Sequence, residues 1–124
     1  MLHAVLWAEI PVTDFERSKK FYSSIYDYEM PEMMMGKNRM GFLLYDRQNK
    51  GVGAAIVQGE GYIPTDKGPR IYLNGGDDLD IILNRIPEAG GTIILKKTFI
   101  SPSDGYFAIF KDPEGNIISL HSSN

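Results

Sequence analysis

The stretch IPVTDFERSKKFYSSI, residues 10–25, decides how the first half of the chain is organised. Thr13 and Glu16 are spaced as a capping box, in which each side chain accepts a hydrogen bond from the backbone NH of the other residue. Behind them, side chains suited to a buried face recur at helical spacing at Ser18, Phe21, Tyr22 and Ile25. The pattern therefore predicts a helix from Asp14 to Ile25.

Short apolar segments flank this helix. The segment Leu2–Val12 precedes it and predicts a strand, and turn formers divide the residues that follow. Three further strands are predicted, at Tyr28–Met35, Met40–Asp46 and Val52–Gln58. The first half thus has the order β-α-β-β-β.

The second half repeats this order. A strand is predicted at Arg70–Asn74, then a helix that starts after Asp77 and Asp78 and ends at Gly90 and Gly91. Three strands follow at Thr92–Thr98, Tyr106–Lys111 and Asn116–His121, and Asp112–Gly115 forms the tight turn between the last two. Asp78 lies about half a chain length after Asp14, at the corresponding place in the second half. The order of elements is therefore repeated, although the two halves share little sequence.

These patterns predict an α+β fold. Two βαβββ modules would form a curved eight-stranded mixed sheet around a cleft, with the helices on the outer face. The chain would be a single domain, 1–124, with module one at about 1–58, a linking loop at 59–69 and module two at about 70–124.

Alternation along three strands predicts which side chains lie opposite the helices. The first strand turns Leu6, Ala8 and Ile10 toward its helix. The face on the other side carries a mixture of aromatic and polar groups, which is the composition of a ligand pocket. Its predicted ligand-binding residues are Trp7, Glu9, Arg70, Tyr72, Asn74, Ser119 and His121.

Each of these groups has a functional and a structural interpretation. Trp7 can stack on a planar ligand or simply fill the groove. Glu9 can act as a base, anchor a cation, or form a salt bridge, for instance to Arg70. If Arg70 is not paired in this way, its guanidinium can bind a ligand carboxylate through two hydrogen bonds. His121 can serve as general acid or base, or make a contact near the chain end. The sequence leaves these alternatives open.

Seven segments, taken in order along the chain, form a recognisable set: Glu9–Asp14, Ser18–Tyr22, Gly59–Tyr62, Asp66–Gly68, Tyr106–Phe110, Asp112–Asn116 and Leu120–Ser122. Together they resemble the vicinal oxygen chelate superfamily of glyoxalases, extradiol dioxygenases and bleomycin-resistance proteins. Within that superfamily the chain looks most similar to small proteins related to lactoylglutathione lyase. The resemblance implies paired modules, a cleft, frequently a homodimer, and in the enzymes a divalent metal held by His or Glu side chains.

The four ligand positions that the resemblance implies are occupied here by Trp7, Ile56, Arg70 and Ser119. An indole and an aliphatic chain have no useful lone pair, a guanidinium is positively charged, and a serine hydroxyl is a weak ligand. We therefore expect neither a metal nor another cofactor.

Composition excludes other classes. With 13 basic and 16 acidic residues the net charge is −3, so nucleic-acid binding is not expected. The chain has no cysteine and only two histidines, His3 and His121, which excludes thiolate chemistry and a histidine-rich metal centre. No apolar run reaches the length of a membrane span and no signal peptide is evident, so we expect a cytoplasmic protein that does not bind membranes.

Our leading interpretation is a glyoxalase-related protein that binds a small organic, anionic molecule in its cleft without the metal of the family. One alternative is a glyoxalase-like lyase or isomerase in which Glu9 or His121 moves a proton. Another is a drug-sequestering or protein-binding dimer, with Met33–Met35 and Gly59–Pro69 at a subunit boundary. A homodimer is expected in any case from the exposed sheet edges and from the resemblance.

Overall fold

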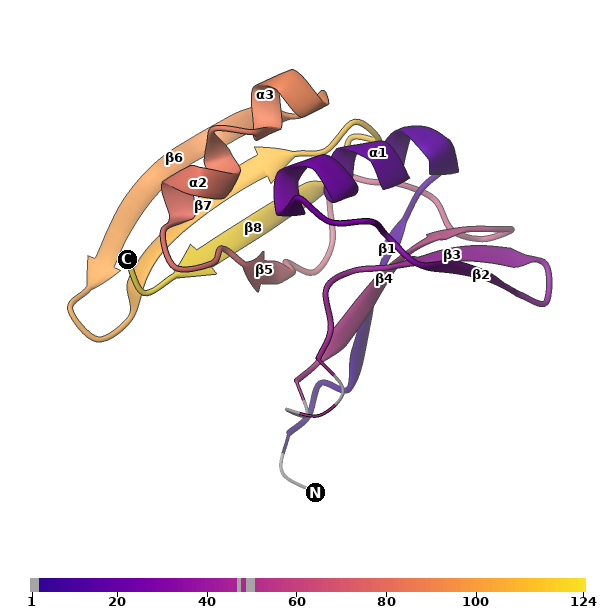
Figure 1. Ribbon diagram of the computed structural model, residues 1–124, viewed down its shortest axis with the longest axis horizontal. Coiled ribbons are helices and arrows are strands. Elements are labelled where there is room, and N and C mark those ends of the chain that lie inside the picture. Colours follow the sequence, from indigo (N-terminus) through magenta and orange to yellow (C-terminus); the bar gives the residue numbers. More distant parts are fainter. Residues whose placement is uncertain (1–2, 47, 49–50) are drawn as a thin grey trace. The chain divides into compact units, whose positions relative to one another are not determined.

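The structure is a computed structural model that describes residues 3–46, 48 and 51–124 (Figure 1). The chain forms two compact units, Met1–Pro64 and Thr65–Asn124, called module one and module two below. The division between them falls inside the loop 59–69 that the sequence marks as a link.

Module one contains a four-stranded sheet and one helix. Its elements are β1 (Trp7–Pro11), α1 (Phe15–Tyr26), β2 (Glu32–Met35), β3 (Asn38–Phe42) and β4 (Gly53–Gln58). The strands lie in the order β1-β4-β3-β2, with β1 parallel to β4 and the other pairs antiparallel. The predicted helix is confirmed with its ends shifted by one residue.

The start of α1 differs from the predicted capping box. Asp14 is the N-cap, and its carboxylate accepts from the backbone NH of Arg17 at 3.2 Å. The NH of Phe15, another donor with no partner inside the helix, bonds to Gln58 Oε1 at 3.0 Å. The Glu16 carboxylate, which a capping box would turn back toward Thr13, forms an ion pair with Arg39.

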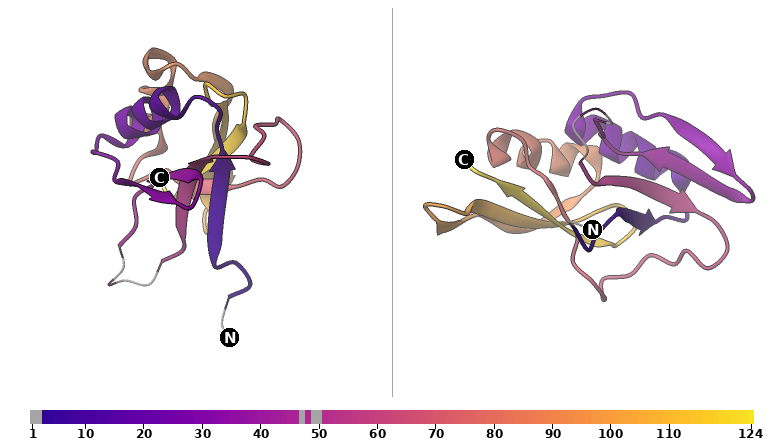
Figure 2. Two further views of the ribbon diagram at one scale, coloured as in Figure 1. Left: turned by 90° about the vertical axis from the view of Figure 1, so that its right-hand side faces the viewer. Right: turned by 90° about the horizontal axis from the view of Figure 1, so that it is seen from below.

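Module two has the same order of strands, but its helix is divided. Its elements are β5 (Tyr72–Asn74), α2 (Leu79–Leu83), α3 (Ile86–Ala89), β6 (Thr92–Ser101), β7 (Gly105–Lys111) and β8 (Ile117–Ser122). The single predicted helix is interrupted before Pro87, because proline has no NH to continue the ladder. The strands lie in the order β5-β8-β7-β6, and both helices lie on one side of this sheet (Figures 1 and 2).

The predicted α+β class with two βαβββ modules is confirmed. In the part of the chain described, hydrogen bonding groups eight strands as two sheets of four, one in each module. None of the helices formed by the described residues is long and apolar enough to cross a membrane.

Five of the predicted strands are shorter in the structure, and the third is Asn38–Phe42 rather than Met40–Asp46. The first begins at Trp7, and Leu6, predicted to face the helix, is 87% exposed, so that prediction is wrong. Residues 28–31 do not belong to β2. Tyr28 instead donates its hydroxyl to the Phe42 carbonyl at 2.6 Å, and burial raises the pKa of this phenol to about 12.

Candidate functional site

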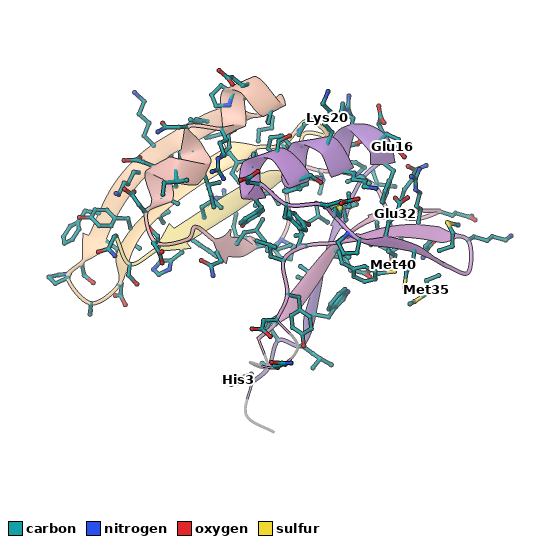
Figure 3. All side chains as sticks on the ribbon, in the orientation of Figure 1. His3, Glu16, Lys20, Glu32, Met35 and Met40 are labelled. Atoms are coloured by element: carbon teal, nitrogen blue, oxygen red, sulfur yellow. The ribbon has the colours of Figure 1, made fainter. Side chains whose placement is uncertain are left out.

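The strand pairing of module one places one set of side chains on the sheet face opposite α1. Residues paired across strands share a face, and Glu9 pairs with Ala55, which in turn pairs with Phe42. We call this the open face of module one; its residues are Trp7, Glu9, Met33, Met35, Met40, Phe42, Ala55 and Val57. Figure 3 shows Met35 and Met40 on the opposite side of the β2–β3 hairpin from Glu16 and Lys20.

The Glu9 carboxylate is the polar centre of this face. The indole Nε1 of Trp7 donates to Oε2 at 3.3 Å, and the hydroxyl of Tyr62 donates to Oε1 at 2.8 Å. The same hydrogen bond raises the pKa of Tyr62, because the carboxylate stabilises the protonated phenol. Trp7 and Glu9 therefore share a face as the alternation predicts.

Aromatic rings surround this carboxylate. The rings of Trp7 and Phe42 meet edge to face, with their centroids 6.2 Å apart. A Cβ at Gly53 would stand only 2.4 Å from the Cζ3 atom of the indole. Gly53 thus leaves the space that the Trp7 ring occupies beside the neighbouring strand.

Tyr62 is the residue of this face that the alternation argument missed. It follows β4 in a turn closed by the bond from its NH to the Gly59 carbonyl at 3.2 Å. Its ring packs on the buried cluster of Met40, Ala55 and Val57. Alternation applies only to strands, so the only available indication was the resemblance, whose segment Gly59–Tyr62 includes this residue.

The open face of module two brings together four of the predicted residues. Tyr72 pairs with Ser119, and Asn74 pairs with His121, so all four lie on one face of the β5–β8 pair. An open cavity of about 510 Å³, largely exposed to solvent, is lined by these residues except Ser119 and by Leu73, whose side chain belongs to the opposite face of β5.

The polar groups of this cavity have defined partners. Asn74 Oδ1 accepts from the NH of Gly76 at 2.8 Å, in the turn that leads to α2. The Nε2 atom of His121 bonds to the carbonyl of Asp104, and a carbonyl can only accept. His121 therefore carries a proton on Nε2, and in the neutral ring Nδ1 remains an acceptor.

Ser119 differs from the other three because its side chain is buried. Its Oγ atom has no hydrogen-bond partner among the residues that the structure describes. Buried polar groups without a partner are rare and costly, and in folded proteins they often belong to sites that accept a ligand or a water molecule.

Arg70 is exposed and lies two residues before β5 rather than in it. Among the described residues of module two, no carboxylate is within ion-pair distance of its guanidinium. The salt bridge expected between Glu9 and Arg70 would join the two modules, and it stays a prediction.

The four positions implied for a metal do not fit one. Ile56 is buried and pairs with Ile10, so it faces α1; the residues of β4 on the open face are Ala55 and Val57, which have no ligand atoms either. Trp7, Arg70 and Ser119 lack ligand groups suited to a divalent cation. Within residues 3–46, 48 and 51–124, no three His, Asp or Glu side chains are grouped as a metal site would require.

Comparison with solved structures gives many similar folds. A hypothetical protein, SA1046 from S. aureus, matches with a TM-score of 0.68 at 19% identity over 98% of this chain and 95% of that one. The antibiotic binding protein TnmS3 from Streptomyces sp. CB03234 matches with a TM-score of 0.64 at 24% identity, over 99% of this chain and 98% of that one. A mutant of glyoxalase I from Zea mays matches with a TM-score of 0.72 at 21% identity over 95% of this chain. The match covers only 45% of the maize protein.

No curated protein matches the sequence. A family profile does match, over residues 2–120, and its extent covers both modules. The chain belongs to the Glyoxalase/Bleomycin resistance protein/Dioxygenase superfamily.

Proposed function

We propose that this protein binds a small, planar organic anion on the open face of module two, without a metal ion. The observation that carries the proposal is the open cavity of about 510 Å³ lined by Tyr72, Leu73, Asn74 and His121. It combines an aromatic ring with two polar side chains, the kinds of group that ligand sites use.

Two neighbouring residues support an anionic ligand. Arg70 is exposed two residues before β5 and has no ion pair with a described residue of module two, and its fork of donors matches a carboxylate or phosphate. Ser119 is the register partner of Tyr72 and holds a hydroxyl with no partner among the described residues.

A binding function also agrees with the character of a structural relative. TnmS3 is described as an antibiotic binding protein, and it shares this fold over nearly its whole length. Binding alone requires no metal ion, and the side chains at the four implied ligand positions do not suit a divalent cation.

Thermal denaturation with three planar anions tests the proposal: benzoate, phenylpyruvate and phenyl phosphate. At least one should raise Tm in a saturable way, because a ligand that binds only the folded state stabilises it. Arg70→Gln should weaken that ligand about tenfold, as expected for loss of one charge-assisted hydrogen bond. Lys20→Gln removes the same charge from an exposed position on α1 and should have no effect.

Ser119→Ala separates ligand binding from stability. Removing a buried hydroxyl that lacks a partner should raise the free energy of unfolding by about 1 kcal/mol. The same change should weaken the bound anion. An unchanged affinity in both Arg70→Gln and Ser119→Ala, or no response to any of the three anions, would contradict the proposed site.

We further propose that the protein is a homodimer. Strand β2 is an edge of its sheet, and Met33, Met34 and Met35 are 46%, 58% and 54% exposed. Exposed apolar side chains along an unpaired strand edge favour pairing with another chain. Sedimentation equilibrium at micromolar concentration should give twice the mass of the chain, and a monomer would contradict this proposal.

A further inference from the structure

We propose that the open face of module one binds an organic ammonium group at Glu9. The site would consist of the Glu9 carboxylate and the rings of Trp7, Phe42 and Tyr62. It differs from the anion site proposed above, because its residues belong to module one and it selects the opposite charge.

The first argument is the charge of Glu9. The carboxylate is half-buried, and each oxygen accepts a hydrogen bond from a neutral donor, Trp7 Nε1 or Tyr62 OH. Among the described residues of module one, no Lys, Arg or His lies within ion-pair distance of it. Within module one the charge is therefore balanced by hydrogen bonds alone, and an ammonium group on this face would supply the counter-charge that the module itself lacks.

The second argument is the aromatic frame. Ammonium groups bind to the faces of Trp, Tyr and Phe rings through the negative potential above each ring. Three such rings are close to the carboxylate: Trp7 is hydrogen-bonded to it, Tyr62 is hydrogen-bonded to it, and Phe42 contacts Trp7. Trp7 is 40% exposed, so a ligand can reach its ring from solvent.

The third argument is that the frame is held in place. Phe42 and Tyr62 pack on the buried cluster of Met40, Ala55 and Val57. The Trp7 ring occupies the space next to Gly53 that a Cβ there would fill, and it contacts Phe42 edge to face. Rings fixed before the ligand arrives lose little conformational entropy on binding.

The same features exclude other ligands from this face. An anion would be repelled by Glu9, and a bare divalent cation needs more oxygen ligands than one carboxylate supplies. A neutral ring could stack on Trp7, but it would leave the Glu9 charge without a partner. An organic ammonium can form an ion pair with Glu9 and also make cation–π contacts with the rings.

Fluorescence of Trp7, the only tryptophan in the chain, provides the measurement. Benzylammonium, benzyl alcohol and benzoate have similar shapes and differ in charge. Benzylammonium should change the emission in a saturable way, with a Kd at least tenfold lower than that of benzyl alcohol, and benzoate should not bind here. Equal affinity for the alcohol and the ammonium would overturn the proposal.

Variants identify the group responsible. Glu9→Gln keeps an oxygen that can accept from Tyr62 but removes the charge, and it should weaken benzylammonium at least tenfold. The matched control is Glu29→Gln, which removes one charge from an exposed position of the same module. Tyr62→Phe keeps the ring and frees one carboxylate oxygen, so its affinity for benzylammonium should stay within about threefold.

Folding and the two sites are checked separately. Each variant is first shown to melt cooperatively and to retain wild-type circular dichroism. If Glu9→Gln fails to fold, wild-type protein still decides the matter through the comparison of ammonium with alcohol. Arg70→Gln should leave benzylammonium binding unchanged, so failure of the anion site and failure of this site give different results.

Discussion

Gly105→Ala is expected to lower the free energy of unfolding by about 3 kcal/mol or more. Gly105 begins β7 with φ at +75°, a conformation that costs an L-residue about 1–2 kcal/mol. A Cβ at this position would also stand 2.3 Å from the Ser122 carbonyl oxygen. Because that atom belongs to the backbone of the adjacent strand, the clash is relieved only by moving β8. Urea denaturation followed by circular dichroism measures the loss.

Gly36→Ala is the matched control for this prediction. Gly36 also has a positive φ, +62°, but nothing lies within 4 Å of a Cβ built there. Its substitution should cost only the conformational part, about 1 kcal/mol. Equal losses at the two positions would show that β8 does not approach Gly105 as closely as described.

Asp112→Ala is expected to cost about 3 kcal/mol. The Asp112 carboxylate is buried and accepts from the backbone NH groups of Glu114 and Asn116, both at 2.9 Å, and from Asn116 Nδ2 at 3.1 Å. The variant leaves these donors without their acceptor, and each buried unsatisfied donor costs about 1–3 kcal/mol. Asn116 in turn accepts from the NH of Thr65 at 3.0 Å, so the start of module two is also released.

The exposed residue Asp66 supplies the control for this measurement. Asp66→Ala removes the same carboxylate from a position with no described hydrogen bond, and it should change the free energy of unfolding by less than about 0.5 kcal/mol. A loss at Asp112 no larger than the loss at Asp66 would mean that the turn contributes little to stability.

Features encoded within a few residues could be predicted from the sequence. The Asp112–Gly115 turn is confirmed, with the NH of Gly115 bonded to the Asp112 carbonyl at 3.0 Å, because its turn formers are adjacent in the chain. Helix α1 is confirmed for the same reason. Its N-cap is Asp14, and the Glu16 carboxylate that the capping box needed pairs with Arg39, a residue 23 positions away in the chain.

Parts of the site depend on contacts that are distant in the sequence. Ile56 was assigned to a ligand position, but register with Ile10 turns it toward the helix, and a single-residue error reverses the face of a strand. Tyr62, which lies in a loop 53 residues after Glu9, donates a hydrogen bond to the Glu9 carboxylate. Strand alternation says nothing about the direction of a side chain in a loop. The burial of Ser119 depends on the packing around it, which its own strand does not encode.

Titration calorimetry of chelator-treated protein tests the central claim, that this superfamily member binds a small organic anion without a metal. Protein is dialysed against EDTA and titrated with the anion that gives the largest rise in Tm among benzoate, phenylpyruvate and phenyl phosphate. We predict saturable binding with the same Kd before and after EDTA, and a Kd about tenfold higher in Arg70→Gln. Binding that disappears with EDTA and returns when zinc or nickel is added, or no saturable binding of any of the three anions, would contradict the account.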